Sequence, residues 1–147
     1  MHPSRIVVTI LATSSLCVAS EKKVALEKLP PAVQQAVKEL AKTSTLIGIT
    51  QETENGAVTY EVETKVDGRT RDVNVGANGA VVLLEEEMPL DQVPAPARGA
   101  IEKKAAGAKI ARVEKVTKGK RVTYEAHIRK RGHRSEFVVA PDGTPTK

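Results

Sequence analysis

The sequence contains few aromatic residues and a single cysteine. Tyr60, Tyr124 and Phe137 account for the 2% aromatic content of the 147 residues, and tryptophan is absent. Proteins that bind single-stranded nucleic acid stack bases on aromatic side chains, so this composition argues against specific nucleic-acid binding. The lone cysteine, Cys17, excludes an internal disulfide. The length fits one ordinary domain or two very small ones, which excludes a large multidomain enzyme.

Residues 1–20 have the layout of a signal peptide. Arg5 precedes an apolar run over residues 6–12, and the small residues Ala19 and Ser20 come before a charged stretch. The apolar run is shorter than the roughly 20 residues that a membrane-spanning helix needs, so we predict no transmembrane segment. With cleavage after Ser20 or after Ala19, the mature protein is expected in the periplasm or outside the cell.

Cys17 raises the alternative of a lipoprotein. In that kind of signal, a leucine and two small residues precede the cysteine that is acylated. Here Ser14 and Ser15 come first and Leu16 lies directly before the cysteine, so the leucine is in the wrong place. We therefore predict that Cys17 is removed with the signal peptide, which leaves a mature chain without a thiol or a cysteine-ligated metal.

The rest of the chain repeats itself at an offset of 64 residues. Val58-Thr59-Tyr60-Glu61 aligns with Val122-Thr123-Tyr124-Glu125. The same offset aligns residues 29–83 with 93–147 without a gap. Apolar positions and turn glycines stay in register together, which a chance alignment would not preserve. We interpret the chain as three segments, which are a signal peptide (1–20) and two units (21–88 and 89–147).

Within each unit the pattern changes from helical to strand-like. The proline pair Pro30-Pro31 opens a segment that is predicted to form a helix of three turns. Its apolar residues recur at three- and four-residue spacing and are Leu29, Val33, Ala36, Val37 and Leu40. Alternating runs divided by turn glycines follow, and these predict antiparallel strands joined by hairpin turns. The strands expected in the first unit cover residues 46–54, 57–66, 69–77 and 80–84.

These elements give the expected fold class, which is α+β with two tandem repeats. Each repeat is expected to have one N-terminal helix packed on an antiparallel sheet of three or four strands. Along the strands, Tyr60 and Val62 alternate with Glu61 and Glu63, so one face is expected under the helix and the other in solvent. A unit of about 60 residues is marginally stable alone, so we expect the units to share a sheet or a packed interface.

Each unit carries the same series of short motifs. A helix opened by proline is followed by a Val-Thr-Tyr-Glu hairpin, a glycine turn, and an apolar strand that ends in Asn-Gly or Asp-Gly. The matching segments are Leu29-Pro30, 58–62, Gly68 and 73–79, with 122–126, Gly132 and 137–143 in the second unit. This series resembles the PepSY-like repeat of exported bacterial proteins and the β-lactamase-inhibitor-like (BLIP-like) fold. The resemblance covers residues 29–147.

The resemblance implies a non-enzymatic exported module. Binding or inhibition of peptidases is proposed for PepSY domains, and inhibition of β-lactamase is known for the inhibitor-like branch. No set of functional residues carries over to this sequence. The inhibitors bind their target through an aromatic-rich concave sheet. The outward positions of the strands here are Thr, Glu, His and Arg, so β-lactamase inhibition is not expected.

Few residues are available for catalysis. After the signal peptide, the sequence contains two histidines, His127 and His133, and two serines, Ser44 and Ser135. His133 and Ser135 share one face of an expected strand, but their side chains diverge and no acid is placed to orient the imidazole. We predict that the chain is not an enzyme and uses no cofactor.

The two histidines also raise the question of a metal site. His127 and His133 flank the expected Arg131-Gly132 turn and could approach each other as half of such a site. Neighbouring arginines and lysines would repel a divalent ion, so we predict no metal there. The Glu85–Glu87 run is expected to be a solvated strand end without specific ion coordination.

Charge is distributed unevenly along the chain. Residues 21–88 contain 8 basic and 12 acidic residues, whereas residues 89–147 contain 14 basic and 6 acidic residues. Much of the positive charge gathers on one expected hairpin, and such a patch attracts anionic partners. The binding residues predicted there are His127, Arg129, Lys130, Arg131, His133 and Arg134.

These observations predict an exported binding protein with an acidic protein partner. A peptidase or another envelope protein is the candidate, and inhibition is one form that the binding could take. The alternative function is binding of an envelope polyanion or a metal ion. Two further interpretations stay open: the charges could protect an edge strand against pairing, or the acidic unit of one copy could meet the basic unit of another.

Overall fold

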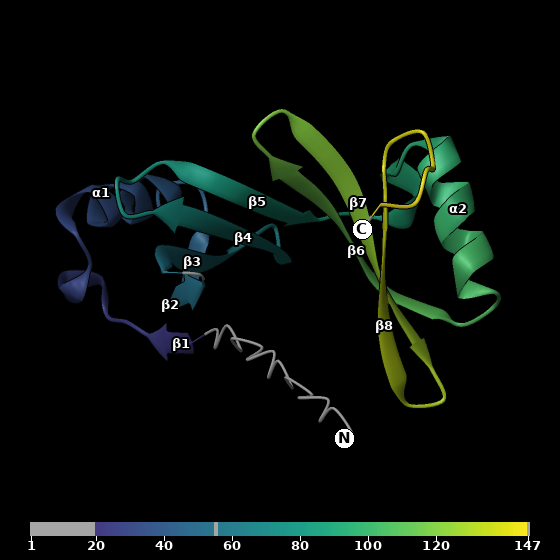
Figure 1. The fold of residues 1–147 in the computed structure, drawn as a ribbon, viewed down its shortest axis with the longest axis horizontal. Coiled ribbons are helices and arrows are strands. Elements are labelled where there is room, and N and C mark those ends of the chain that lie inside the picture. Colours follow the sequence, from purple (N-terminus) through teal and green to yellow (C-terminus); the bar gives the residue numbers. More distant parts are fainter. Residues whose placement is uncertain (1–19, 55, 147) are drawn as a thin grey trace, which may run out of the picture.

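One continuous antiparallel sheet runs through the protein. The structure is a computed structural model, which describes residues 20–54 and 56–146. Eight strands follow one another in the sheet in chain order (Figure 1). They are β1 (Ser20–Lys23), β2 (Thr45–Glu54), β3 (Ala57–Val66), β4 (Arg69–Gly76), β5 (Val81–Glu87), β6 (Lys109–Lys118), β7 (Arg121–Lys130) and β8 (His133–Val139). Apart from Ser20, the predicted signal peptide with Cys17 lies outside the described residues.

The expected fold class, in which two tandem repeats each pack one helix on an antiparallel sheet of three or four strands, is wrong, whereas the expectation that the two units share a sheet is confirmed. β5 and β6 pair directly, with Leu84 opposite Thr117 and Glu87 opposite Glu114, so the strands form a single sheet. The prediction ended the fourth strand at Leu84, whereas β5 continues through Glu87, and that extension supplies most of the residues that pair with β6. Separate sheets would have left unpaired backbone N–H and C=O groups along the edges of β5 and β6.

The other predicted strands match closely, and one strand was missed. β2, β3 and β4 differ from the predicted ranges by one residue at most at either end. The missed strand is β1, which pairs antiparallel with residues 50–53 of β2. Its sequence, Ser-Glu-Lys-Lys, lacks the apolar alternation that marks a strand, so the sequence pattern gave no signal there.

Two helices begin where the prolines predict them. α1 (Pro31–Leu40) and α2 (Ala95–Ala105) both carry proline in the first turn, where the backbone N–H has no partner within the helix. A short 3₁₀ turn precedes each helix, η1 (Leu26–Lys28) and η2 (Leu90–Gln92). Ala106 caps the C-terminal end of α2, and its backbone is left-handed with a φ of 48°.

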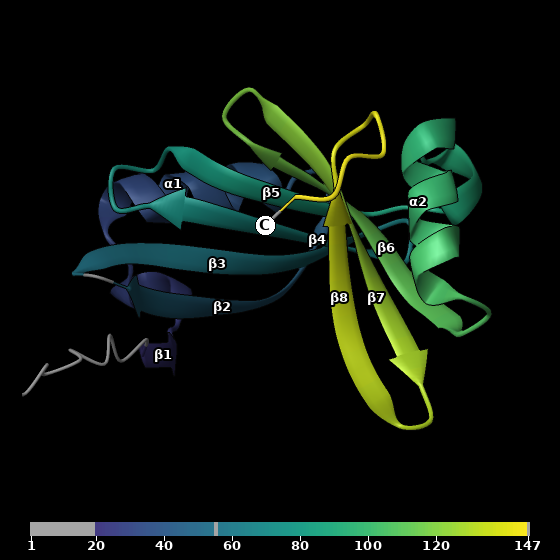
Figure 2. The same cartoon turned by 45° about the vertical axis from the view of Figure 1, so that its right-hand side comes forward.

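Both helices lie on the same face of the sheet. The strand register places Val73 opposite Leu84 and, across the next pair of strands, Leu84 opposite Thr117. Since every second residue of a strand points to the same face, Val113, four residues from Thr117, shares the face of Val73. Val73 belongs to the hydrophobic cluster of α1 and Val113 to that of α2. Figures 1 and 2 show α1 beside the first half of the sheet and α2 beside the second half.

Each helix has its own hydrophobic cluster. The buried residues around α1 are Leu29, Val33, Val37, Ile49, Tyr60, Val62, Val73 and Val75. Those around α2 are Val93, Ala97, Ile101, Ala105, Val113, Tyr124, Ala126, Ile128 and Val139. The predicted alternation is confirmed, because buried Tyr60 and Val62 alternate with the half-buried Glu61 and Glu63. No helix covers the opposite face within the described residues, and we call it the open face.

Two turns pack against the helices through glycine. Gly79 has a φ of +82°, and a methyl group placed there would lie 2.7 Å from the carbonyl oxygen of Ala32 in α1. Gly143 has a φ of +86°, and a methyl group placed there would lie 2.7 Å from the carbonyl oxygen of Pro96 in α2. Only glycine avoids both the contact and the left-handed strain at these positions.

Gly79→Ala should therefore destabilise the protein more than Gly68→Ala. Both glycines have positive φ, +82° and +78°, so each substitution costs about 1–2 kcal/mol of left-handed strain. Gly79→Ala also overlaps with Ala32, which brings the expected loss to about 3 kcal/mol. Nothing lies within 4 Å of the new methyl group at Gly68. Urea unfolding of the two variants measures the difference, and equal losses would contradict the close packing of the turn on α1.

Candidate functional site

The open face places carboxylates directly beside one another. Strand pairing forms one row from Glu63, Asp72 and Glu85, across β3, β4 and β5. A second row consists of Glu87, Glu114 and Glu125, across β5, β6 and β7. Like charges at directly opposed positions of neighbouring strands are destabilising. The open face therefore carries an arrangement of charges that the stability of the sheet does not favour.

Several of these carboxyl groups bind protons more tightly than an isolated carboxyl group. Partial burial, reinforced by the negative charges of Glu52 and other neighbours, raises the pKa of Glu61 to about 7. Partial burial and neighbouring carboxylates also raise the pKa of Glu85 to about 7. The same causes raise the pKa of Asp72 and of Glu125. The charge of the open face thus changes with pH between the acidic range and neutrality.

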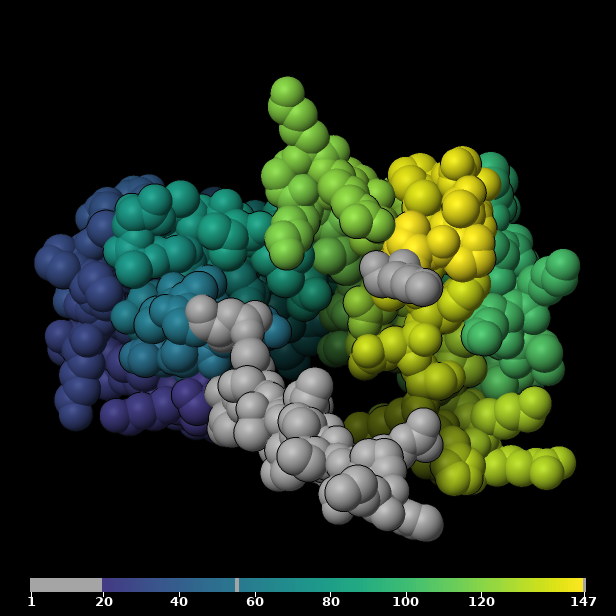
Figure 3. Space-filling view, in the orientation of Figure 1, coloured from purple at the N-terminus to yellow at the C-terminus, as the bar shows by residue number. Residues whose placement is uncertain are grey.

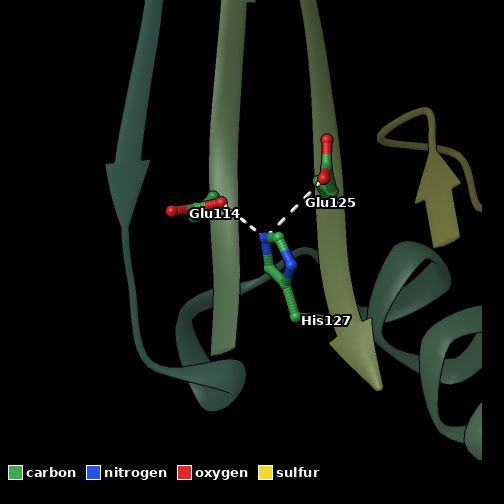
Figure 4. Close-up of side chains that lie close together, drawn as sticks. All are labelled: Glu114, Glu125 and His127. Carbon is green, nitrogen blue, oxygen red and sulfur yellow. Dashed lines mark hydrogen bonds and ion pairs between the residues drawn. The ribbon is translucent and has the colours of Figure 1, made fainter. Parts of the chain in front are cut away.

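A histidine lies among these carboxylates on β6 and β7 (Figure 4). Nε2 of His127 is 2.8 Å from Oε2 of Glu114 and 3.6 Å from Oε1 of Glu125. A carboxylate accepts hydrogen bonds, so Nε2 donates to Glu114. On the other side of the ring, Nδ1 of His127 is 3.6 Å from Oε1 of Glu136. The side chain of Glu114 is only 5% exposed, and a buried carboxylate of this kind requires partners.

Arg112 reaches this cluster because of a β-bulge. The pairing of β6 with β7 shifts between Ile110 and Arg112, which makes Ala111 an extra residue. The bulge places Arg112 opposite His127, on the open face. Nε of Arg112 then lies 3.0 Å from Oε1 of Glu114. Arg112 and Glu114 were not predicted as site residues, since a bulge within a charged strand leaves no mark in the alternation of polar and apolar residues.

The residues of the predicted basic hairpin are divided between the two faces. Arg129 lies opposite Arg134 on the open face, whereas Lys130 lies opposite His133 on the face that carries the helices. Arg131 forms the turn, with a φ of 48°. All five side chains are exposed. Within the described part of the chain, none of them forms an ion pair.

The structure does not bring the two predicted histidines together. His127 pairs with Glu136 and points to the open face, whereas His133 pairs with Lys130, three pairs nearer to the turn, and points to the other face. The half metal site considered from the sequence is therefore not formed. Ser135 shares the face of His133 as predicted, and no acid is hydrogen-bonded to His133 among residues 20–54 and 56–146.

A depression opens on the second half of the sheet, beside the basic hairpin. Its volume is about 730 Å³, and it is lined by Ala111, Arg112, His127, Ile128, Arg129, Arg134, Ser135 and Glu136. Figure 3 shows the turn between β6 and β7 and the turn between β7 and β8 as two separate projections from this half. The depression thus joins the arginine pair of the hairpin to the cluster around His127.

Solved structures with a similar fold identify the architecture. They include a proposed periplasmic protein from Bacteroides eggerthii, with a TM-score of 0.66, 19% identity, and coverage of 81% of this chain and 86% of that chain. A DUF2874 family protein from Bacteroides ovatus has a TM-score of 0.63 and 18% identity over 82% and 86% of the two chains. A BLIP-like protein from Bacteroides fragilis has a TM-score of 0.60 and 19% identity over 81% and 84%. The chain therefore has a BLIP-like fold.

Comparisons at the level of sequence give no match. No protein-family model matches the chain, and no curated protein does. The PepSY-like resemblance and the division into units 21–88 and 89–147 therefore stay predictions. In the part of the chain that the structure describes, neither helix has the length and apolar character required to cross a membrane.

Removing a carboxyl group from the open face should stabilise the protein above neutral pH. A raised pKa in the folded state means that folding favours the protonated acid, so this stabilisation is present below pH 4.5 and is lost as pH rises to about 7. At pH 8, Glu61→Gln and Glu85→Gln should each increase the free energy of unfolding by about 1 kcal/mol or less, since solvent screens partly exposed groups.

Urea unfolding at pH 4.5 and pH 8 measures this effect. Both variants should lose less stability than the parent between the two pH values. Glu102→Gln, on the exposed side of α2, is the control and should follow the parent. A pH dependence that is unchanged in both open-face variants would show that the pKa values of Glu61 and Glu85 are not raised in the folded protein.

Proposed function

We propose that this chain is an exported, non-enzymatic binding protein that docks an acidic partner protein on its basic hairpin. The basic hairpin comprises residues 127–134, and its binding residues are His127, Arg129, Lys130, Arg131, His133 and Arg134. Arg129 and Arg134 form the centre of the contact, on the open face. The partner is an envelope protein, and a peptidase that is inhibited by the contact is the specific form of this proposal.

The opposed pair of arginines is the observation that carries the proposal. Arg129 and Arg134 are direct cross-strand neighbours, and like charges in that position weaken a hairpin. No acidic group within the described residues forms an ion pair with either of them. An acidic surface on a partner would supply the missing counter-charges. The pair therefore suits a contact that forms between molecules better than one within the molecule.

The shape of this region also favours binding. The hairpin of β7 and β8 projects beyond α2, so its turn is accessible from several sides (Figure 2). The depression next to it is lined by Arg112, Arg129 and Arg134. Arginine is enriched among the residues that contribute most to protein–protein affinity. A protruding acidic segment of a partner would fit this arrangement.

The BLIP-like fold supports a binding role by analogy alone, because one fold serves many functions. The predicted signal peptide and the likeness to a proposed periplasmic protein support an envelope location. The open face differs from the aromatic-rich binding surface of the inhibitors. Tyr60 and Tyr124 are buried in the helix clusters and do not point to the open face. Charge, and not aromatic contact, is the proposed basis of recognition.

Reversing the charge of the arginine pair should weaken selective capture of the partner. The chain, expressed with its own leader and immobilised at physiological salt, is incubated with an envelope extract of the source organism. The double variant Arg129→Glu/Arg134→Glu should bind the captured protein about tenfold more weakly or worse, and binding by the parent should fall steeply with added salt.

The matched control is Lys38→Glu/Lys103→Glu, which changes the net charge by the same amount on exposed helix positions. This variant should bind like the parent. Equal capture by both double variants would contradict the proposal. Capture of polymer without protein would favour the polyanion alternative, and inhibition of a captured peptidase would support the inhibitory form.

A further inference from the structure

We propose that Glu114, Glu125 and His127 bind a divalent transition-metal ion, for which zinc is the best match. One imidazole nitrogen and two carboxylate oxygens form a ligand set that zinc accepts, with a further position left for water. The proposal shares His127 with the proposed partner contact but rests on separate observations, and zinc binding is tested without a partner. It also differs from the site considered from the sequence, because it does not involve His133.

The candidate ligand atoms are close enough to share one ion. Nε2 of His127 and one carboxylate oxygen each from Glu114 and Glu125 all lie within 4.8 Å of one another. The distances from Nε2 to the two oxygens are 2.8 Å and 3.6 Å. Ligands about 2.0–2.2 Å from a tetrahedral zinc ion lie about 3.3–3.6 Å apart, so small side-chain movements suffice. The ion takes the position of the proton that Nε2 donates to Glu114.

One ligand is already held by a neighbouring group, and a second has a carboxylate close to its free ring nitrogen. Oε1 of Glu136 lies 3.6 Å from Nδ1 of His127, on the side of the ring away from Nε2. Arg112 occupies Oε1 of Glu114 at 3.0 Å and leaves Oε2 facing the imidazole. Histidine ligands commonly donate their second N–H to a carboxylate, and ligating carboxylates are themselves hydrogen-bonded. These partners distinguish the site from an ordinary group of surface acids.

The sheet fixes the positions of the three ligands. Glu114 and Glu125 are directly opposed on β6 and β7, and His127 follows two residues later on the same face. Glu114 is 5% exposed, whereas His127 and Glu125 are 24% and 21% exposed. The site thus has a buried carboxylate on one side and an opening on the other. His127 also lines the depression, through which an ion and a water ligand can enter.

Arg112 limits the affinity of the site. Its Nη2 lies 3.4 Å from Nε2 of His127, so a bound ion displaces this contact and stays close to a positive charge. The shorter contact of Arg112, with Oε1 of Glu114, does not compete with the ion. We therefore expect binding that is reversible and readily measured by titration, without the very high affinity of a buried structural zinc site.

Calorimetric titration of the full chain with Zn²⁺ tests the proposal. Every sample carries Cys17→Ser, which removes the one thiol of the chain. The parent should bind one ion per chain at this site, and His127→Gln should weaken that binding at least about tenfold. Co²⁺ should give the visible absorption of a tetrahedral site in the parent, and His127→Gln should lack it. Glu136→Gln should weaken binding about ten- to hundredfold by releasing the imidazole.

The matched control is His133→Gln, on the opposite face of the same hairpin. It should bind zinc like the parent. Glu125→Gln removes a partly exposed ligand and keeps the test valid where His127→Gln fails to fold. Absence of zinc binding by the parent would overturn the proposal, as would equal affinities of the parent and Glu125→Gln or equal losses in His127→Gln and His133→Gln.

Discussion

The pairing of β5 with β6 is the interaction on which the rest of the structure depends. It joins only residues 84–87 to residues 114–117, yet it makes one sheet from strands that serve two separate hydrophobic clusters. Its register also places both helices on the same face. The pairing includes Glu87 opposite Glu114, so the backbone hydrogen bonds of this seam form despite repulsion between side chains.

Because both helices cover one face, no helix covers the charged side chains of the opposite face within the described residues, and both proposals concern this open face. The carboxylate rows of the first strands lead to the cluster around His127 and then to the arginine pair at the end of the β7–β8 hairpin. The carboxylate rows and the arginine pair both place like charges side by side, which lowers the stability of the sheet. The burial of Tyr60 and Tyr124 in the helix clusters removes aromatic side chains from this surface. The two proposals therefore both rest on charge: guanidinium groups are proposed to contact an acidic partner, and a histidine with carboxylates is proposed to bind a metal ion.

Local sequence patterns predicted the elements well and their assembly poorly. Prolines and apolar spacing located both helices, and alternation with turn glycines located β2, β3 and β4. The units share a sheet as expected, but the pairing that joins them was not predicted, because the run Glu85–Glu87 has the composition of a solvated strand end and yet pairs with β6. The basic residues of the hairpin were visible in the sequence, but the cluster of Glu114 and Arg112 depends on a bulge at Ala111. A pattern of alternating residues does not reveal such an insertion.

We propose that the second half of the open face is the binding surface. In arginine-specific chemical labelling of the chain, alone and with its captured partner bound, Arg129 and Arg134 should become protected in the complex. Arg98 on α2 should be labelled as in the free protein. Unchanged labelling of the arginine pair, together with protection of Arg98, would place the contact on the helix side and show that the open face does not bind the partner.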